Sequence, residues 1–364
     1  MNIYQAKQTV IEAGKQLLEC GLIVRTWGNI SCRISESEFV ITPSGKPYHT
    51  LTPKDIVIVK IDDLSYSGNV KPSSEKGIHA DCYKTRPDVN FVIHTHQTNA
   101  SALSVLKRDI CTDIESDCIG NVIPCADYGL PGQSKLRKGV KAAVERSSSK
   151  AILMAHHGAL CMGESYDEAF RVANELERVC GEYIKEKFKR EPFENNAHPS
   201  ESEYSNGVIH FKDEYWDTDV SEDALDLTPE QCIHRDIYAA YPKIKHIIHT
   251  ADDDVTEASA QGKKIAPYLD DFAQLVGLGV KTAKTSAKLV GKLRFRNAVL
   301  LKNNGGYCCA GDKYNAEAVE TVLKKNCKTY LDAQQAGNIK PLSTLDSLLM
   351  RVVYKLKYSK QAEK

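Results

Sequence analysis

Apolar residues recur every three or four positions in two long stretches of the first half of the chain. This spacing places apolar side chains on one face of a helix, because an α-helix has 3.6 residues per turn. We therefore predict amphipathic helices over about residues 4–22 and 165–187. Their apolar positions are Ala6, Val10, Ala13, Leu17 and Leu18 in the first helix, and Ala169, Val172, Leu176, Val179 and Tyr183 in the second.

Short apolar runs lie between these two helices. They are rich in isoleucine and valine and are bounded by turn signals such as Thr42-Pro-Ser-Gly45, which is typical of strands. A further helix is expected over about residues 74–86. The predicted strands cover residues 29–33, 39–42, 56–59, 91–94 and 151–155.

The pattern of the first half recurs in the second half. Glu75-Lys-Gly-Ile-His-Ala-Asp-Cys-Tyr83 resembles Glu230-Gln-Cys-Ile-His-Arg-Asp-Ile-Tyr238, and Val92-Ile-His-Thr95 resembles Ile247-Ile-His-Thr250 at the same offset. Ala151-Ile-Leu-Met-Ala-His-His-Gly158 resembles Ala298-Val-Leu-Leu-Lys-Asn-Asn-Gly305. Ungapped self-similarity of this kind indicates a tandem duplication, so the two halves should share one fold.

The duplication sets the expected domain boundaries. A polar stretch with proline and asparagine separates the two similar halves, and we interpret it as a linker with some local structure. We predict a first domain at residues 1–190, a linker at 191–222 and a second domain at 223–364. Each domain is long enough to bury a core of its own.

Charge and cysteine content bear on the partners and the compartment. Lysine plus arginine and aspartate plus glutamate number 48 each, so no net charge favours nucleic acid or an anionic membrane. No run approaches the roughly 18 apolar residues of a membrane span, and the first residues do not resemble a signal peptide. With 12 scattered cysteines and no CxxC pair, we expect reduced core thiols and a cytoplasmic location.

The histidines suggest a metal site. His94 and His96 are two residues apart in a predicted strand and so point to one face of it. A second pair, His156 and His157, follows another predicted strand and precedes Gly158, which permits a sharp turn. Three imidazoles with one open position describe a catalytic zinc site and also suit other divalent metals. Each cluster taken alone also fits structural or surface histidines.

Glu75 and several turns admit two interpretations each. Glu75 follows two serines at the start of a predicted helix, where it is either part of a helix cap or a general acid/base. Helix starts and tight turns also bind phosphate through free N–H groups. The candidate segments are Trp27-Gly28-Asn29, Pro43-Ser44-Gly45 and Ser73-Ser74, and each of them can equally be a plain turn or cap.

At these residues the chain resembles the class II aldolase and adducin family. The resemblance covers almost all of residues 1–187 and is highly specific, and within the family it is greatest to the L-fuculose-phosphate aldolases. The matching motifs are Gly28-Asn29-Ile-Ser31, Thr42-Pro-Ser-Gly45, Lys71-Pro-Ser-Ser-Glu75, His94-Thr-His96, Ile123-Pro-Cys-Ala126 and His156-His-Gly158.

The resemblance implies a fold and a set of site residues. The fold is a three-layer αβα arrangement, a mixed β-sheet flanked by helices, here repeated twice. A divalent metal, most often Zn²⁺, is implied on His94, His96 and His157, with His156 as a neighbour. Glu75 is implied as the acid/base. A substrate phosphate is implied among Gly28, Asn29, Ser44, Gly45, Ser73 and Ser74.

The resemblance also implies an activity. The expected reaction is cleavage of a ketose phosphate to dihydroxyacetone phosphate and an aldehyde through a metal-stabilised enediolate. Two alternatives remain open: an epimerase, dehydratase or decarboxylase on the same scaffold, and a non-catalytic adducin-like interaction protein. The first domain's three histidines disfavour the last alternative. The sequence does not identify the sugar.

The second half departs from the family pattern at the metal ligands. His249 remains, but Ala251 replaces the second histidine and Asn303-Asn304 replaces the histidine pair. We therefore expect a degenerate second domain without its own metal. Because single-domain relatives form fourfold rings, the resemblance also implies a homo-oligomer, with two fused pairs completing a pseudo-fourfold ring.

Overall fold

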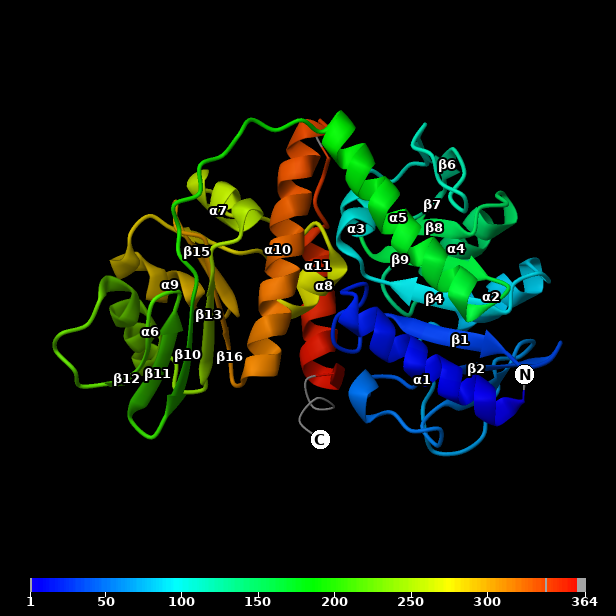
Figure 1. The fold of residues 1–364 in the computed structure, drawn as a ribbon, viewed down its shortest axis with the longest axis horizontal. Coiled ribbons are helices and arrows are strands. Elements are labelled where there is room, and N and C mark those ends of the chain that lie inside the picture. The colour runs from blue at the N-terminus through cyan, green and yellow to red at the C-terminus, as the bar shows by residue number, and fades with distance from the viewer. Residues whose placement is uncertain (1, 338, 359–364) are drawn as a thin grey trace. The chain divides into compact units, whose positions relative to one another are not determined.

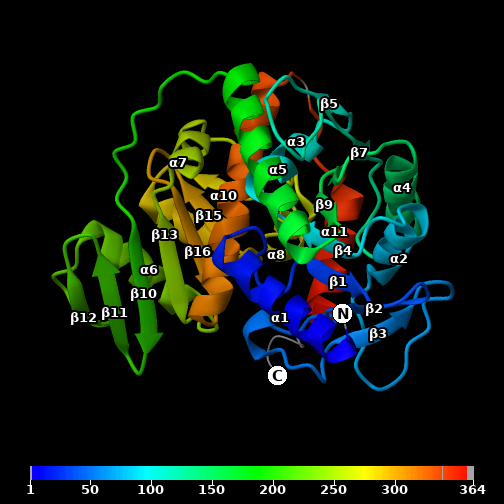
Figure 2. The ribbon, with the colours of Figure 1, turned by 45° about the vertical axis from the view of Figure 1, so that its right-hand side comes forward.

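The computed structural model describes residues 2–337 and 339–358, which fall into two compact units (Figures 1 and 2). Among the described residues, one unit comprises 2–189 with 355–358, and the other comprises 190–337 with 339–354. Each unit contains a seven-stranded sheet with helices packed on it. The α/β fold expected from the sequence, a mixed sheet flanked by helices and repeated twice, is confirmed.

The sheet of the first unit is mixed. Its strand order is β3-β2-β1-β4-β9-β8-β7, in which only the β7–β8 pair is parallel. A separate pair, β5 (Ile110–Cys111) and β6 (Val122–Ile123), lies outside it. The seven strands are β1 (Asn29–Arg33), β2 (Glu38–Ile41), β3 (Val57–Lys60), β4 (Phe91–Thr95), β7 (Cys125–Ala126), β8 (Ala151–Met154) and β9 (Gly158–Gly163).

Helices cover both faces of this sheet. Asn2 and Gln5 form a capping box at the start of α1, and Ser165 caps α5. Helices α1, α3 and α5 pack on one face, and α2 and α4 pack on the other. Their bounds are α1 (Ile3–Glu19), α2 (Lys76–Thr85), α3 (Thr98–Ser104), α4 (Ser134–Glu145) and α5 (Tyr166–Lys187), with a 3₁₀ turn at Tyr48–Thr50.

The core beneath α2 and α4 holds the first unit together. Phe39 of β2, Val92 of β4 and Leu160 of β9 are fully buried and meet Ile78 of α2 and Leu136 of α4. Burying one such side chain stabilises the fold by about 1.5–3 kcal/mol. This packing fixes the start of α2 against the ends of the central strands, where the polar residues described below lie.

The second unit repeats the arrangement. Its strand order is β12-β11-β10-β13-β16-β15-β14, again with one parallel pair, β14–β15. The strands are β10 (Ser200–Ser205), β11 (Val208–Asp213), β12 (Asp217–Ser221), β13 (His246–Thr250), β14 (Thr282–Ala283), β15 (Ala298–Leu301) and β16 (Gly306–Ala310).

The helices of the second unit also follow the first. Helices α6 and α9 cover one face of the sheet, as α2 and α4 do, while α7 and α10 cover the other. Helix α11 packs on α8. The bounds are α6 (Pro229–Ala240), α7 (Asp253–Ala260), α8 (Asp270–Leu275), α9 (Leu289–Leu293), α10 (Lys313–Gln335) and α11 (Thr344–Val353), with a short 3₁₀ turn at Ser286–Lys288. A π turn follows α11 at Tyr354–Tyr358, where the second unit ends.

The structure differs from the sequence analysis in the segment at residues 191–222. A linker with some local structure was expected there, but residues 200–221 form β10, β11 and β12, three strands of the second sheet. The three strands are rich in charged and hydroxyl residues because they lie toward one edge of the sheet. Their polar composition conceals the alternation that marks a strand.

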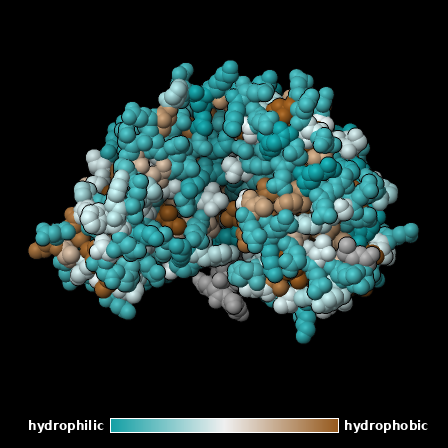
Figure 3. Space-filling view, in the orientation of Figure 1, coloured by the Kyte–Doolittle hydropathy of each residue, from teal (hydrophilic) through white to brown (hydrophobic). Residues whose placement is uncertain are grey.

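The surface and the helices agree with the composition. Hydrophilic side chains dominate the visible surface of both units (Figure 3). Within the described residues, no helix combines the length and the apolar content that crossing a bilayer requires. The helices and strands predicted in the first half of the chain are confirmed, to within two residues at most ends.

Candidate active site

The two histidine clusters of the first unit come together because their strands are neighbours. His94 lies in β4, and His96 follows the end of this strand. His157 lies in the turn between β8 and β9, and β9 pairs with β4. The three side chains are buried, with 2%, 4% and 3% of their surfaces exposed. The sheet therefore brings together His94 and His157, which are 63 positions apart in the sequence.

The three imidazoles form a group that could hold one metal ion. Their candidate ligand atoms lie within 4.8 Å of one another. The rings of His94 and His157 are parallel, and their Nε2 atoms are 2.9 Å apart. Nδ1 of His94 lies 2.9 Å from the Ala159 carbonyl, to which it donates, which leaves the lone pair on Nε2. Burial lowers the pKa of His94 well below its usual value, so the ring is neutral as a metal ligand must be.

Glu75 faces these imidazoles. Its Oε2 lies 3.5 Å from Nε2 of His94, and its Oε1 lies 3.4 Å from Nε2 of His157. The amide of Asn29 donates to Oε2 at 2.9 Å. Burial by itself raises the pKa of the Glu75 carboxyl, but His94, His157 and Asn29 outweigh burial and hold the pKa below its usual range. The carboxylate is thus ionised and able to accept a proton.

The capping interpretation of Glu75 does not describe its side chain. Glu75 is the N-cap residue of α2, but its carboxylate makes no capping hydrogen bond. Instead its backbone N–H donates to the hydroxyl of Ser73 at 3.2 Å. The carboxylate is therefore available to the histidines.

Two glycines allow the backbone to approach this site closely. A side chain at Gly28, where φ is +98°, would meet the carbonyl of His94 at 2.7 Å. A side chain at Gly158 would meet the carbonyl of Thr95 at 2.1 Å. In the turn before Gly158, His156 adopts a φ of 61°, and the centroid of its buried ring lies 5.5 Å from that of Tyr128. His156 is outside the group of candidate ligands.

The residues expected around a phosphate lie in three adjoining segments. Pro43 and Pro72 form an isolated bridge, which sets Ser44 and Gly45 beside Ser73 and Ser74. Gly28 and Asn29 join them because Ile30 and Thr42 exchange hydrogen bonds. The N–H groups of Ser44 and Ser73 donate to the carbonyls of Lys71 and Thr42. Because these N–H groups are used within the fold, the hydroxyl groups of the two serines are the groups that could donate to an anion.

Three residues of the site were given no role on the basis of the sequence. His79, Ser31 and Tyr83 extend from Asn29 into the core by hydrogen bonds. Their signal was present, because Glu75, His79 and Tyr83 are spaced by four and share one face of α2. The periodicity was visible, but the partners on β1 could be identified only from the fold.

The second unit retains part of this arrangement. Glu230 and His249 correspond to Glu75 and His94, and Nδ1 of His249 lies 2.8 Å from Oε1 of Glu230. Nε2 of His249 donates to the backbone carbonyl of Asn304. Within the described residues of Arg190–Tyr354 no three metal-ligating side chains gather. Ala251 and Asn304 stand where the first unit has its other two ligands.

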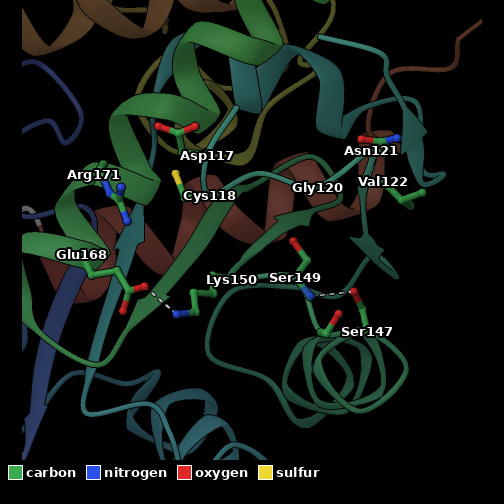
Figure 4. Close-up of a pocket in the computed structure, with 11 residues that line it drawn as sticks. Asp117, Cys118, Gly120, Asn121, Val122, Ser147, Ser149, Lys150, Glu168 and Arg171 are labelled. Atoms are coloured by element: carbon green, nitrogen blue, oxygen red, sulfur yellow. Dashed lines mark hydrogen bonds and ion pairs between the residues drawn. The ribbon is translucent and has the colours of Figure 1, made fainter. Parts of the chain in front are cut away.

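A separate cavity of about 420 Å³ lies at the other end of β8 (Figure 4). Lys150 precedes this strand and pairs with Glu168 at 2.5 Å, whereas His157 follows the strand. Asp117 and Arg171 also line the cavity, so both charge signs are present. The cavity does not reach the histidine group.

Comparison with known proteins identifies the relatives of this chain. A sequence model of the Class II Aldolase and Adducin N-terminal domain matches residues 8–184 and again residues 207–331. The L-fuculose phosphate aldolase of Haemophilus influenzae is 35% identical over 187 residues, which are 51% of this chain and 85% of that protein. A 5-methylthioribulose-1-phosphate/5-deoxyribulose-1-phosphate aldolase of Escherichia coli is 35% identical over 180 residues, 49% of this chain and 83% of that protein.

A solved structure, described as L-fuculose 1-phosphate aldolase, is 31% identical, with a TM-score of 0.48. It covers 52% of this chain and 89% of that chain. The two segments matched by the family model agree with the tandem duplication read from the sequence.

Proposed function

The chain belongs to the class II aldolase and adducin family, and from this premise we propose that its first unit is a metal-dependent aldolase acting on a ketose phosphate. The products would be dihydroxyacetone phosphate and an aldehyde. The observation that carries the proposal is the gathering of His94, His96 and His157 around the Glu75 carboxylate. Two sugar-phosphate aldolases that each match about half of the chain support the substrate class.

The three imidazoles would hold a divalent cation, and Zn²⁺ suits three neutral nitrogens with one open position. When bound, the cation supplies Lewis-acid stabilisation of the negative charge that develops on the substrate oxygens. The chain prepares for the cation in two ways. Burial keeps His94 neutral, and the Ala159 carbonyl fixes which of its nitrogens carries the proton.

Glu75 would move the proton. In the synthetic direction its carboxylate takes a proton from the hydroxymethyl carbon of dihydroxyacetone phosphate. In the cleavage direction it returns that proton after the carbon–carbon bond has broken. The carboxylate is ionised and faces the imidazoles, as proton removal in the synthetic direction requires. In the cleavage direction the carboxyl must first take up the proton that it then delivers.

The phosphate would lie among Gly28, Asn29, Ser44, Gly45, Ser73 and Ser74. Ser44 and Ser73 would offer hydroxyls, because their N–H groups are used within the fold. These contacts are remote from the bond that breaks, so they would fix the orientation of the substrate rather than take part in the chemistry.

The second unit is proposed to be a degenerate copy that binds no metal. The catalytic domain at residues 1–190 remains a proposal, as does the homo-oligomer that completes a pseudo-fourfold ring. Light scattering tests the assembly: a stable monomer with full activity would reject it.

The test of function is a product assay with the metal-loaded full chain. Fuculose, rhamnulose, ribulose, methylthioribulose and deoxypentulose phosphates are screened with coupled detection of dihydroxyacetone phosphate. Release of that product by the wild type, but not by Glu75→Gln, is expected. An isomeric sugar phosphate with an unbroken carbon chain would indicate an epimerase instead. A protein that binds no metal and converts no substrate would support an interaction protein.

A further inference from the structure

Five polar side chains form a buried line that begins at the proposed acid/base. They are Glu75, Asn29, His79, Ser31 and Tyr83, and between 0% and 8% of each is exposed. Polar groups so deeply buried are costly unless each finds a hydrogen-bond partner. The line therefore has a definite internal order of donors and acceptors.

The contacts of the line are short. The Asn29 amide nitrogen lies 2.9 Å from Oε2 of Glu75, and the Asn29 amide oxygen faces Nε2 of His79. Nδ1 of His79 lies 2.6 Å from the hydroxyl oxygen of Ser31. That oxygen lies 2.6 Å from the hydroxyl of Tyr83.

Chemistry fixes the direction of every bond in the line. The carboxylate of Glu75 only accepts, so Asn29 turns its NH₂ toward Glu75 and its oxygen toward His79. Burial lowers the pKa of His79 to about 4, so the ring is neutral with one hydrogen, which sits on Nε2. Nδ1 of His79 accepts from Ser31, and the oxygen of Ser31 accepts from Tyr83. All the hydrogens thus point toward Glu75.

We infer that His79 is a positioning residue for Glu75, because its Nε2–H holds the Asn29 amide with the NH₂ group on Oε2. This inference rests on the proposed function. With Oε2 occupied by Asn29, the proton that Glu75 transfers is carried on Oε1. Oε1 lies 3.4 Å from Nε2 of His157. Without His79, the amide could rotate and set its oxygen against the carboxylate.

The second unit contains a related line, in which the Tyr238 hydroxyl also donates to the backbone carbonyl of Ser202 and Nε2 of His234 lies 3.3 Å from Oε1 of Glu230. The Ser200 hydroxyl donates to Oε1 of Glu230 at 2.9 Å and lies 3.2 Å from Nε2 of His234. Ser202 lies 2.6 Å from Nδ1 of His234 and 2.8 Å from the Tyr238 hydroxyl. The line is therefore compatible with the fold in either unit. Only the first unit has an asparagine, whose donor and acceptor ends are distinct, in the link to the carboxylate.

The test compares two amide substitutions of His79. The amide of glutamine can reach the place of Nε2 and donate to Asn29, whereas the amide of asparagine reaches only the place of Nδ1. The probe is exchange of the hydroxymethyl hydrogens of dihydroxyacetone phosphate with D₂O, followed by NMR on the metal-loaded full chain. We expect His79→Gln to keep a rate close to wild type. His79→Asn should lose about 100-fold at unchanged metal content, the cost of misplacing a catalytic group by about 1 Å.

The second unit supplies the matched control. His234→Asn makes the same change in the related buried line and should leave the exchange rate unchanged. Equal rates for wild type and His79→Asn would overturn the inference. Should His79→Asn not fold, Asn29→Ser tests the same link, because the second unit folds with serine there, and a wild-type rate in that variant would also overturn it.

A readout independent of activity separates this inference from the proposed function. Long-range ¹⁵N–¹H spectra of the histidine-labelled, metal-free full chain should show His79 as the neutral Nε2–H form between about pH 6 and 8. A hydrogen on Nδ1 would overturn the inference even if the protein is an aldolase. Absence of exchange by the wild type would instead reject the proposed function, while the spectra still decide the order of the line.

Discussion

The hydroxyl of Tyr307 donates a hydrogen bond of 2.7 Å to Oε2 of Glu230. In the ladder of strands Tyr307 pairs with His249, and the residue that pairs with His94 in the first unit is Leu160. The Tyr307 ring stacks on His249, with centroids 4.3 Å apart. The carboxylate of Glu230 thus contacts a phenol as well as the imidazoles of His249 and His234. The positions of His96 and His157 are taken by Ala251 and Asn304 in the second unit.

This difference predicts one bound metal ion per chain. Replacing His157 by alanine should weaken metal binding by more than about 100-fold, because even the loss of an outer partner of a ligand costs about 10–100-fold. Metal content after equilibrium dialysis measures the effect. His249→Ala, the matched change in the second unit, should retain one ion. Two ions per wild-type chain would contradict the account.

Glu75→Gln should separate proton transfer from metal binding. The amide keeps the size of the carboxylate but cannot accept the proton, so turnover should fall by about 100–10,000-fold. Metal content should stay near the wild-type value, since the three histidines remain. Exchange of dihydroxyacetone phosphate with D₂O provides the rate. Glu230→Gln, the control in the second unit, should exchange at the wild-type rate. A comparable loss of rate in that variant would show that catalysis does not belong to the first unit alone.

Stability should fall with acid between about pH 6.5 and 4, in part because of His79. Its folded pKa is about 4, below the ordinary value of 6.5, so the folded state excludes a proton that the unfolded state binds. The stabilisation is present above pH 6.5 and is lost as the pH falls toward 4. The shift of the His79 pKa from 6.5 to about 4 corresponds to a loss of about 3 kcal/mol in the free energy of unfolding once His79 is fully protonated.

Urea unfolding at pH 7 and pH 5 measures this effect. The shift of the midpoint between the two pH values should be smaller in His79→Gln, which has no titrating group at that position. An unchanged shift would show that His79 does not contribute to acid sensitivity.

Two bidentate ion pairs of the first unit should differ in strength. Arg137 of α4 contacts both carboxylate oxygens of Asp81 on α2, at 2.6 and 2.7 Å, and Asp81 is buried. Arg146 holds both carboxylate oxygens of Asp109 at the same two distances, nearer the surface. Removing Arg137 leaves a buried acceptor without its partner, which costs about 1–3 kcal/mol. Removing Arg146 should cost less than about 1 kcal/mol. Chemical unfolding of Arg137→Ala and Arg146→Ala compares them, and equal losses would contradict this prediction.

Much of the fold was predictable because apolar periodicity and burial coincide in the first unit. The strand at residues 91–95 is buried along its whole length, and its run of apolar residues predicts a buried strand. By contrast, β12 alternates between exposed and partly buried positions and contains two aspartates. Its stability comes from pairing with β11, a long-range interaction that single-strand composition does not record.

The candidate site was predictable in its residue types but not in its connections. His94, His96 and His157 followed from strand geometry and the family motifs, and the structure brings their rings together. The orientation of the Asn29 side-chain amide, in contrast, is inferred to depend on His79, which approaches it from α2. Such a link requires the register between β1 and α2, which only the folded chain defines.

X-ray absorption at the zinc edge of the zinc-loaded full chain tests the central claim most directly. The account predicts three imidazole nitrogens at about 2.0–2.1 Å from the ion, and two in His157→Ala. A sulfur ligand at about 2.3 Å, or an unchanged spectrum in His157→Ala, would contradict the account.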